Sequence, residues 1–335
     1  MAKPKNKDEY RAELAEHFAH ILEEKGLDWK QGWSGGGRDA PMNGITKACY
    51  RGSNAFWLSL IAMSKGYDDP RWVTMVQIMD KKGTYHPKSK WHLKAGSKAV
   101  YVEYWYPFDL IKRCALTWEQ YGEELKNGRA ETDFRLASQY TAVFNACEVE
   151  GMPELKKEPL NEITPDELVK KLSENMGVEI INDGGGSAYY QPLQDKIHLP
   201  APGKFFSDYD YNSTALHELA HSTGHVLRLG RSMAGGFGSP QYAYEELVAE
   251  MASCFMGVSL TGEIPSSHLN NHKAYVQSWI KAIREKPETL MKAIKEAQTA
   301  ASYMDWKAGL ITELEYLKNA GSAKAVKVKE RELER

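Results

Sequence analysis

The chain has 335 residues, 42% of them hydrophobic and 26% charged, and its formal net charge is −2. These values suit a folded chain with buried cores, and they exclude an acidic mimic of DNA and a uniformly basic nucleic-acid coat. No apolar run approaches the roughly 18 residues that a membrane span needs, and no apolar segment follows the N-terminal lysines, so we expect neither a span nor a signal peptide. The four cysteines are far apart in sequence, which favours a reducing, cytoplasmic location over a disulfide scaffold.

Basic residues and tryptophans gather in the first third of the chain. Residues 38–113 hold 13 Lys and Arg against 6 Asp and Glu, and seven of the nine tryptophans lie in the first 118 residues. From residue 156 onward the balance is 21 basic to 24 acidic residues. This asymmetry predicts two domains with different partners, and the helices and strands expected along the chain make the fold class α+β. We place the parts at 1–153 (first domain), 154–165 (linker), 166–310 (second domain) and 311–335 (charged helical tail).

Residue patterns in the N-terminal half predict two helices and two strands. Apolar residues at helical spacing predict a helix over 8–25, which stops at a glycine, and a second over 53–64. Ser53 or Asn54 is the expected N-cap of the second helix, and Gly66 lies just beyond its end. Strands are predicted by their β-branched and aromatic residues over 71–79 and 98–106.

The C-terminal half begins with a clear helix start, because Thr164 can cap a helix whose first position is Pro165. Short strands are predicted over 178–181 and 194–200. Helices are predicted over three further stretches, the last of them interrupted at a proline: 213–223, 241–257 and 272–301.

The strongest chemical signal is His-Glu-Leu-Ala-His at residues 217–221. On a helix, His217 and His221 share one face and can bind one zinc ion, with manganese as an alternative. Glu218 between them can then act as general base on an attacking water. We expect Ser213 to cap this helix and Gly224 to end it.

A catalytic zinc site usually has three protein ligands, so one more donor is expected. Glu246 lies 25 residues after His221 and forms an i, i+4 pair with Glu250. Thermolysin-like zincins, or gluzincins, use a similar pair: the first acid ligates the metal and the second orients a ligand histidine. We therefore predict Glu246 as ligand and Glu250 as the orienting acid. The alternative ligands that remain open are His225, Glu245, His268 and His272.

The segment before this helix suggests a substrate-binding edge. Residues 195–200 are the candidate for an edge strand that pairs with an extended peptide. Tyr189 and Tyr190, which follow a glycine run, are candidates for stabilising an oxyanion. The alternative is a turn with packed aromatic rings.

The first domain combines lysines with aromatic rings, as single-stranded nucleic acid binding requires. The alternative is that most of these tryptophans lie in the core and that the lysines form a solvated face. The candidate DNA-binding residues are Trp33, Asn43, Tyr50, Arg51, Asn54, Arg71, Trp72, Lys90, Lys94 and Lys98.

The sequence also resembles the ArdC family of antirestriction proteins of conjugative plasmids and phages. The resemblance covers most of residues 10–300 and includes His217 to Gly224 and Glu245 to Glu250. The remaining matching stretches are Trp29 to Trp33, Pro41 to Asn43, Tyr50 to Asn54, Arg71 to Thr74 with Gln77, Lys94 to Gly96, Thr141 to Asn145, Ala188 to Tyr190 and Arg228 to Arg231.

This resemblance implies an N-terminal α/β domain that binds single-stranded DNA, and double-stranded DNA more weakly. It also implies a C-terminal, gluzincin-like zinc metalloendopeptidase domain, with a DNA-bound host defence protein as a candidate substrate. The implied role is to protect incoming mobile-element DNA from host restriction. Two alternatives remain: a DNA-binding shield whose zincin domain is inert and structural, and a nuclease that uses the same metal.

Overall fold

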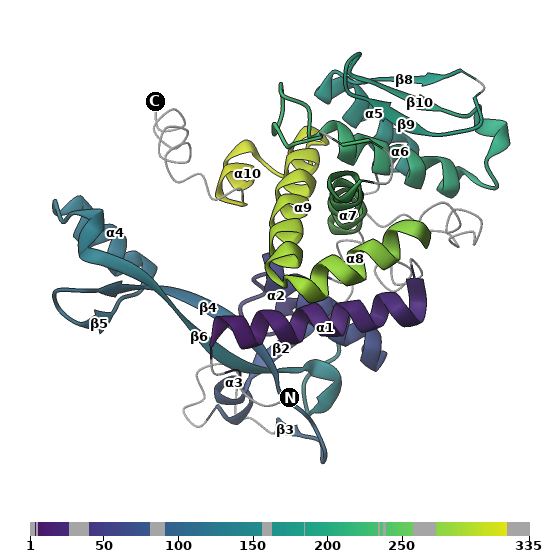
Figure 1. Cartoon of the computed structure of the whole chain (residues 1–335). Coiled ribbons are helices and arrows are strands. Elements are labelled where there is room, and N and C mark those ends of the chain that lie inside the picture. The colour runs from purple at the N-terminus through teal and green to yellow at the C-terminus, as the bar shows by residue number, and fades with distance from the viewer. Residues whose placement is uncertain are drawn as a thin grey trace. The chain divides into compact units, whose positions relative to one another are not determined.

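The computed structural model describes residues 4, 6–26, 40–80, 91–155, 163–183, 185–233, 235–236, 239–256 and 273–319 (Figure 1). Two compact units share the chain. Unit 1 comprises residues 1–9, 41–49 and 67–155, and unit 2 comprises residues 10–40, 50–66 and 156–335. The units are therefore not two consecutive halves, because two N-terminal segments pack with the C-terminal residues.

Unit 1 is built on a five-stranded sheet of order β1-β2-β6-β4-β5. Its core gathers Val73, Ile78, Phe144 and Val149, all buried. A separate antiparallel pair joins β3 to β7. The strands of this unit are β1 (Met42–Asn43), β2 (Arg71–Thr74), β3 (His92–Leu93), β4 (Val100–Asp109), β5 (Cys114–Ala115), β6 (Phe134–Asn145) and β7 (Val149–Glu150).

The strand predicted over 71–79 was wrong in its second half. β2 ends at Thr74, and Met75–Met79 form the short helix α3. The Thr74 side chain accepts from the backbone N–H of Gln77, whose side chain accepts in turn from the Thr74 N–H. This capping box satisfies two helix-end donors and outweighs the β propensity of the Val and Ile residues beyond it.

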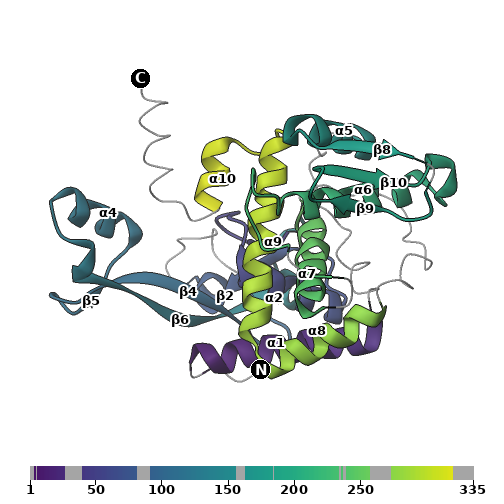
Figure 2. The ribbon, with the colours of Figure 1, turned by 45° about the horizontal axis from the view of Figure 1, so that its top comes forward.

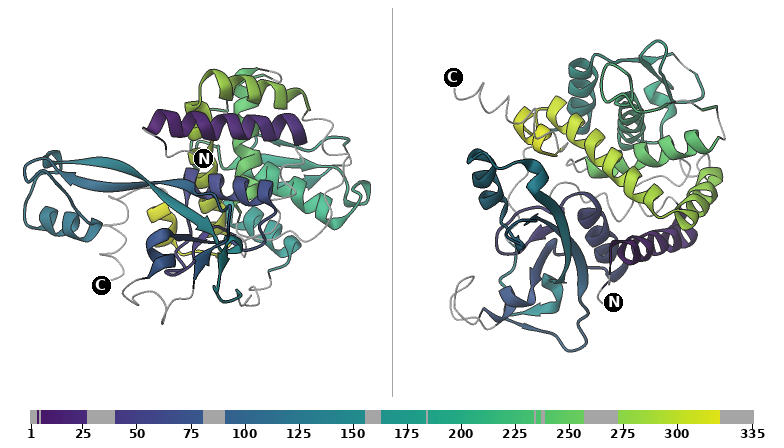
Figure 3. Two further views of the ribbon diagram at one scale, coloured as in Figure 1. Left: turned by 90° about the horizontal axis from the view of Figure 1, so that it is seen from below. Right: turned by 60° about the vertical axis from the view of Figure 1, so that its left-hand side comes forward.

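The longest strands of unit 1, β4 and β6, form a two-stranded antiparallel ribbon that the sequence predicted only in part. Their register runs from Val100 opposite Val143 to Asp109 opposite Phe134. Figure 3 shows the ribbon twisting away from β2 and ending at β5 and the helix α4 (Trp118–Lys126). Strand β6 was missed because polar residues interrupt its apolar pattern: both faces of the outer ribbon are partly exposed.

Ion pairs hold the tip of this ribbon together. The Arg129 guanidinium donates to Asp109 at 3.1 and 3.2 Å, to Glu124 at 3.1 Å and to Asp133 at 2.9 Å. Asp109 is fully buried and also accepts from two backbone N–H groups of the β4–β5 turn. One cation thus joins β4, α4 and the turn that leads into β6.

Unit 2 is mainly helical, and Figure 2 shows its helices beside a small sheet. Almost all of α1 (Lys7–Lys25) and the whole of α2 (Gly52–Lys65) belong to it. Ring contacts join Phe18 of α1 to Phe56 of α2, and Phe56 to Phe255. The other helices are α5 (Pro165–Met176), α6 (Asp208–Ser222), α7 (Pro240–Phe255), α8 (Lys273–Glu285), α9 (Glu288–Lys307) and α10 (Glu313–Asn319).

Several predicted helix ends are confirmed in unit 2. Thr164 caps α5, and Pro165 is its first residue. Gly66 follows α2 with φ of 65°, a left-handed conformation that suits glycine. The long helix predicted over 272–301 breaks at Pro287, as expected. The cap predicted for α2 was wrong, because Arg51 holds that position and makes no side-chain cap.

The sheet of unit 2 has the order β8-β10-β9, with β8 at Glu179–Asn182, β9 at Tyr189–Gln191 and β10 at Lys196–Leu199. β10 pairs with β8 on one side and with β9 on the other. Residues 195–200 are therefore not an edge strand, and that expectation was wrong. The two edges of this sheet are β8 and β9.

Helix α6 begins earlier than predicted. Ser207, not Ser213, is its N-cap, and its side chain accepts from the Asp210 N–H. The helix ends at Ser222, with Thr223 in the capping position, one residue before the expected Gly224. In the part of the chain that the structure describes, no helix combines the length and apolar composition needed to cross a membrane.

The packing of unit 1 predicts a sharp response to one added methyl group. A Cβ on Gly44 would lie 2.7 Å from Val73 Cγ1 and 2.8 Å from Met152 Cε. Because Val73 is fully buried and cannot retreat, Gly44→Ala should lower the free energy of unfolding by about 1–3 kcal/mol, measured by urea denaturation. Gly122→Ala in α4 is the control: no heavy atom lies within 4 Å of its Cβ position, and stability should stay equal or rise. Equal stability of Gly44→Ala and the wild type would contradict the packing argument.

Candidate metal centre

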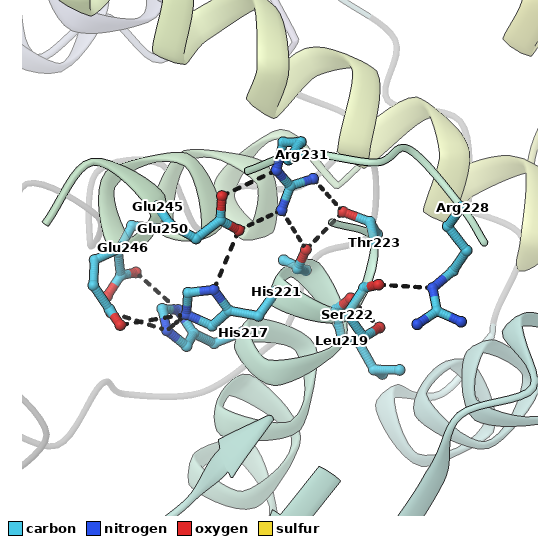
Figure 4. A network of polar contacts seen from close by, with 11 residues as sticks. His217, Leu219, His221, Ser222, Thr223, Arg228, Arg231, Glu245, Glu246 and Glu250 are labelled. Carbon is cyan, nitrogen blue, oxygen red and sulfur yellow. Dashed lines mark hydrogen bonds and ion pairs between the residues drawn. The ribbon is translucent and has the colours of Figure 1, made fainter. Parts of the chain in front are cut away.

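Two adjacent helices of unit 2 carry the candidate centre (Figure 4). The helical spacing of α6 directs His217 and His221 to one side, with Glu218 one residue away and buried. Helix α7 lies alongside and contributes three acids, all buried: Glu245, Glu246 and Glu250. The predicted histidine pair and the predicted acid pair therefore meet.

Three side chains offer converging donor atoms. The Nε2 atoms of His217 and His221 lie 3.0 Å apart, and the Glu246 carboxylate oxygens lie 3.5 Å from each of them. All three donors fall within 4.8 Å of one another. Two ligands each about 2.1 Å from a tetrahedral ion lie roughly 3.4 Å apart, so this spacing fits one divalent metal ion. Two imidazoles and a carboxylate suit zinc or manganese.

The histidines and the acids of the cluster compensate one another's charge. Burial works to lower the pKa of His221, but its contacts with Glu245 and Glu246 outweigh this and raise the pKa to about 9. Burial works in the opposite direction on Glu246, but the two histidines hold its pKa well below the usual range. Glu246 therefore remains an anion, which is the form that can ligate a cation.

Each histidine has its own carboxylate on the nitrogen that faces away from the donor cluster. Glu250 Oε2 lies 3.7 Å from His217 Nδ1, where an orienting acid was expected. Glu245 Oε1 lies 3.4 Å from His221 Nδ1. Since Nδ1 of His221 faces Glu245 while its Nε2 faces Glu246, Glu245 lies on the outer side of the ring and not among the donors.

Glu245 is held in turn by Arg231. The guanidinium donates to both Glu245 oxygens, at 3.1 and 2.5 Å, to Thr223 Oγ1 at 2.6 Å and to the Ala220 carbonyl at 3.0 Å. Arg231 thereby ties α7 to the end of α6. Sequence reasoning missed it, since Arg231 lies outside both helices and no spacing rule links it to Glu245.

Glu218 lies beside the donor cluster in an apolar setting. Burial raises its pKa, and the nearby histidines only partly offset this. The nearby backbone of Tyr190 in β9 also lowers its pKa slightly. A carboxylate with a raised pKa, beside the cluster and near an edge strand, is suited to accept and return a proton.

The alternative ligands lie elsewhere or outside the described residues. His225 follows the end of α6, and its Nδ1 is 3.8 Å from Asp195 Oδ2. His268 and His272 fall outside the described residues. Of the two tyrosines expected near an oxyanion, Tyr190 is buried and donates to Asp195 Oδ1 at 2.7 Å, whereas Tyr189 is 45% exposed and stacks on His198.

The predicted DNA-binding residues are divided between the units. In unit 1, Arg71 is buried and paired with Asp69, and Trp72 is 1% exposed, so neither offers a surface to a ligand. Asn43 accepts from the backbone of the turn that follows it. Lys94 and Lys98 are exposed.

In unit 2, Arg51 is exposed, whereas Tyr50 and Asn54 are partly buried. The Asn54 side chain accepts from the Tyr10 hydroxyl at 3.2 Å, which joins α1 to α2. Trp33 and Lys90 lie outside the described residues.

Comparison with protein families gives two consecutive matches. Residues 8–144 match the N-terminal domain of the anti-restriction factor ArdC. Residues 167–296 match a zincin-like metallopeptidase family, MPTase-PolyVal, and this range contains the whole candidate metal centre.

The chain is also similar to curated proteins. Two DNA primases TraC of Escherichia coli are 32% identical over 308 residues and 34% identical over 303 residues. These matches cover 89% and 87% of this chain but 27% and 19% of the primases, so the chain spans about a quarter of their length or less. An uncharacterised protein, y4eC of Sinorhizobium fredii, is 28% identical over 84% of this chain and 87% of its own length.

Two crystal structures of the antirestriction protein ArdC from plasmid R388 share the fold. The Mn(II)-bound structure matches with a TM-score of 0.66 and 28% identity, over 89% of this chain and 97% of that one. The metal-free structure matches with a TM-score of 0.65 and 24% identity, over 90% and 99%.

The carboxylate behind His221 generates a prediction for metal affinity. Glu245→Ala leaves all three donors in place but frees the His221 ring to rotate, so metal binding should weaken about 10- to 100-fold in titration calorimetry. Glu179→Ala, an exposed acid on β8 paired with Lys196, is the control and should bind metal like the wild type. Wild-type affinity in Glu245→Ala would show that His221 needs no outer partner.

Proposed function

Because the chain belongs to the ArdC family of antirestriction proteins, we propose that it protects incoming mobile-element DNA from host restriction by combining single-stranded DNA binding with a metal-dependent peptidase. The observation that carries the peptidase part is the convergence of His217, His221 and Glu246 beside Glu218. Four side chains of zincin type lie together on two helices; Glu218, His221 and Glu246 are buried and His217 is partly buried.

In this proposal His217, His221 and Glu246 hold the metal, and Glu250 and Glu245 orient the two imidazoles. Zinc is the expected ion and manganese the alternative, which the Mn(II)-bound ArdC structure from plasmid R388 supports. The ion, when bound, supplies a Lewis acid for the scissile carbonyl. Glu218 takes the proton of the attacking water and passes it to the leaving amine.

The substrate strand is proposed to pair with β9. This strand is one of the two edges of the small sheet, and it packs against α6, which carries Glu218. An extended peptide added to this edge would run past the general base. Tyr189, exposed on the same strand, is the candidate for stabilising an oxyanion, whereas the Tyr190 hydroxyl is committed to Asp195.

The DNA-binding part of the proposal rests on the match to the ArdC N-terminal domain and on the similarity to two DNA primases. Single-stranded DNA is the expected ligand, with weaker binding of duplex DNA. Tethering on DNA would raise the effective concentration of a DNA-bound host defence protein, the candidate substrate, near the metal centre.

The metal ligands can be tested by elemental analysis of the purified chain. We expect about one divalent ion per chain in the wild type and little in His217→Ala and Glu246→Ala, because losing one of three donors removes most of the affinity. Glu179→Ala serves again as a control that should keep the ion. Full metal occupancy in Glu246→Ala would show that another residue is the third ligand.

A test of the catalytic role of Glu218 distinguishes an active peptidase from an inert, structural zincin domain. Glu218→Gln keeps the size of the side chain but removes its basicity, so peptide cleavage should stop while bound metal and DNA affinity remain. The readouts are cleavage of candidate DNA-bound proteins, elemental analysis and an oligonucleotide shift. If Glu218→Gln still protects DNA from restriction in cells, the inert, structural zincin domain becomes the better reading. Loss of DNA binding in a folded Glu218→Gln protein would show that the two activities share a site.

A further inference from the structure

The outer half of the β4–β6 ribbon has two faces of different character. Beyond the β2 pairing, which ends at Thr74 opposite Val143, β4 and β6 continue as two strands until β5 joins β4 at Phe108 and Asp109. Side chains alternate between the faces along each strand. The register therefore assigns each outer residue to one face or the other. One face, here called the aromatic face, carries three rings from β4 and three residues from β6. These are Tyr104, Tyr106 and Phe108 from β4, and Arg135, Ala137 and Gln139 from β6.

The aromatic face presents rings and a cation but no acid. Tyr104 is 48% exposed, and its ring lies 18° from parallel to that of Tyr106, with centroids 6.4 Å apart. The Arg135 guanidinium lies over the Phe108 ring at 5.1 Å, and Arg135 itself is exposed. Three rings in a row thus end at a positive charge.

The opposite face differs because α4 packs on its tip and its acids are already paired, although Trp105 and Leu136 remain exposed on it. Near the tip, Tyr121 of α4 packs edge-on against Phe134, and Arg129 lies over the same ring. Its two acids are satisfied internally: Asp109 is paired with Arg129, and Glu103 accepts from the Tyr140 hydroxyl. The helix at the tip therefore packs on this face and not on the aromatic face.

We infer that the aromatic face of the β4–β6 ribbon is where unit 1 stacks the bases of single-stranded nucleic acid. Rings arranged along one strand offer flat surfaces to successive unpaired bases, and Arg135 supplies a cation for a phosphate or a further base. Bases within a duplex are already stacked on one another and cannot use these rings. The absence of acids among these six positions removes the repulsion that a phosphate chain would meet on a mixed surface.

This inference rests on the proposed DNA binding but changes its location. Three ring-bearing residues were expected from sequence: Trp33 lies outside the described residues, Trp72 lies in the core, and Tyr50 is partly buried in unit 2. The aromatic face supplies an exposed ring, Tyr104, beside the partly buried rings of Tyr106 and Phe108, and the sequence analysis did not single these out.

The test compares full-length variants on the two faces. Tyr104→Ala/Tyr106→Ala should bind a fluorescent 30-nucleotide single strand more weakly by roughly 5- to 100-fold for each ring lost. Tyr104→Phe/Tyr106→Phe keeps both rings and should bind like the wild type. Trp105→Ala is the matched control, since Trp105 is an exposed ring on the same strand but on the opposite face.

Arg135→Gln provides an independent readout. If its guanidinium neutralises one phosphate, the variant should reduce the slope of log affinity against log salt by about 0.7. Thermal melting of every variant confirms that the ribbon is folded.

The outcomes separate the inference from the proposed function. A wild-type chain that does not bind the oligonucleotide overturns the proposed DNA binding itself. A wild type that binds, with Tyr104→Ala/Tyr106→Ala equal to it, leaves DNA binding intact but overturns the aromatic face as its site and points to a protein partner there. Equal weakening by Trp105→Ala would also overturn it, because the effect would then not belong to one face.

Discussion

The burial of charged groups between α6 and α7 is the constraint on which unit 2 depends. Taking an ion out of water costs several kcal/mol unless a partner compensates it. Each buried acid of α7 therefore has a cationic neighbour: Glu246 lies between two histidines, Glu250 beside His217 and Glu245 against Arg231. A shift of one helical turn between the helices, about 5.4 Å, would separate all of these pairs at once.

The surrounding contacts keep that register. The Ser239 side chain caps the start of α7, and the Trp279 Nε1–H donates to the Ala243 carbonyl at 2.6 Å, which fixes α8 on the first turn of α7. Arg231 joins the other side by binding Glu245 and the last turn of α6 together. The donor cluster is thus preorganised by the packing of its supporting residues, which is what a selective metal centre requires.

In unit 1 the main constraint is the stability of the β4–β6 ribbon, and ion pairs at its tip meet it. A two-stranded ribbon has too little core to be stable alone, and its tip is held by Arg129, which joins β4, α4 and the turn that leads into β6. This arrangement places the acids of the ribbon on one face and satisfies them there. The other face keeps its rings and its arginine for contact with another molecule.

The sequence by itself determined the features that depend on local spacing. The histidine pair follows from the helical period, the start of α5 from Thr164 and Pro165, and the break before α9 from Pro287. The acid pair of α7 was found in the same way, because Glu246 and Glu250 are one helical turn apart. Such features require only that the neighbouring residues be helical.

Only the tertiary structure decided which residues meet across elements. It placed α1 and α2 with unit 2, set β10 between the edge strands β8 and β9, and buried Trp72. It also brought Arg231 to Glu245, and Glu245 to His221, through packing that no sequence spacing encodes. The faces of the β4–β6 ribbon were decided there as well: alternation along one strand is visible in sequence, but the register that unites Tyr104, Tyr106 and Arg135 on one face is set by the pairing of two strands.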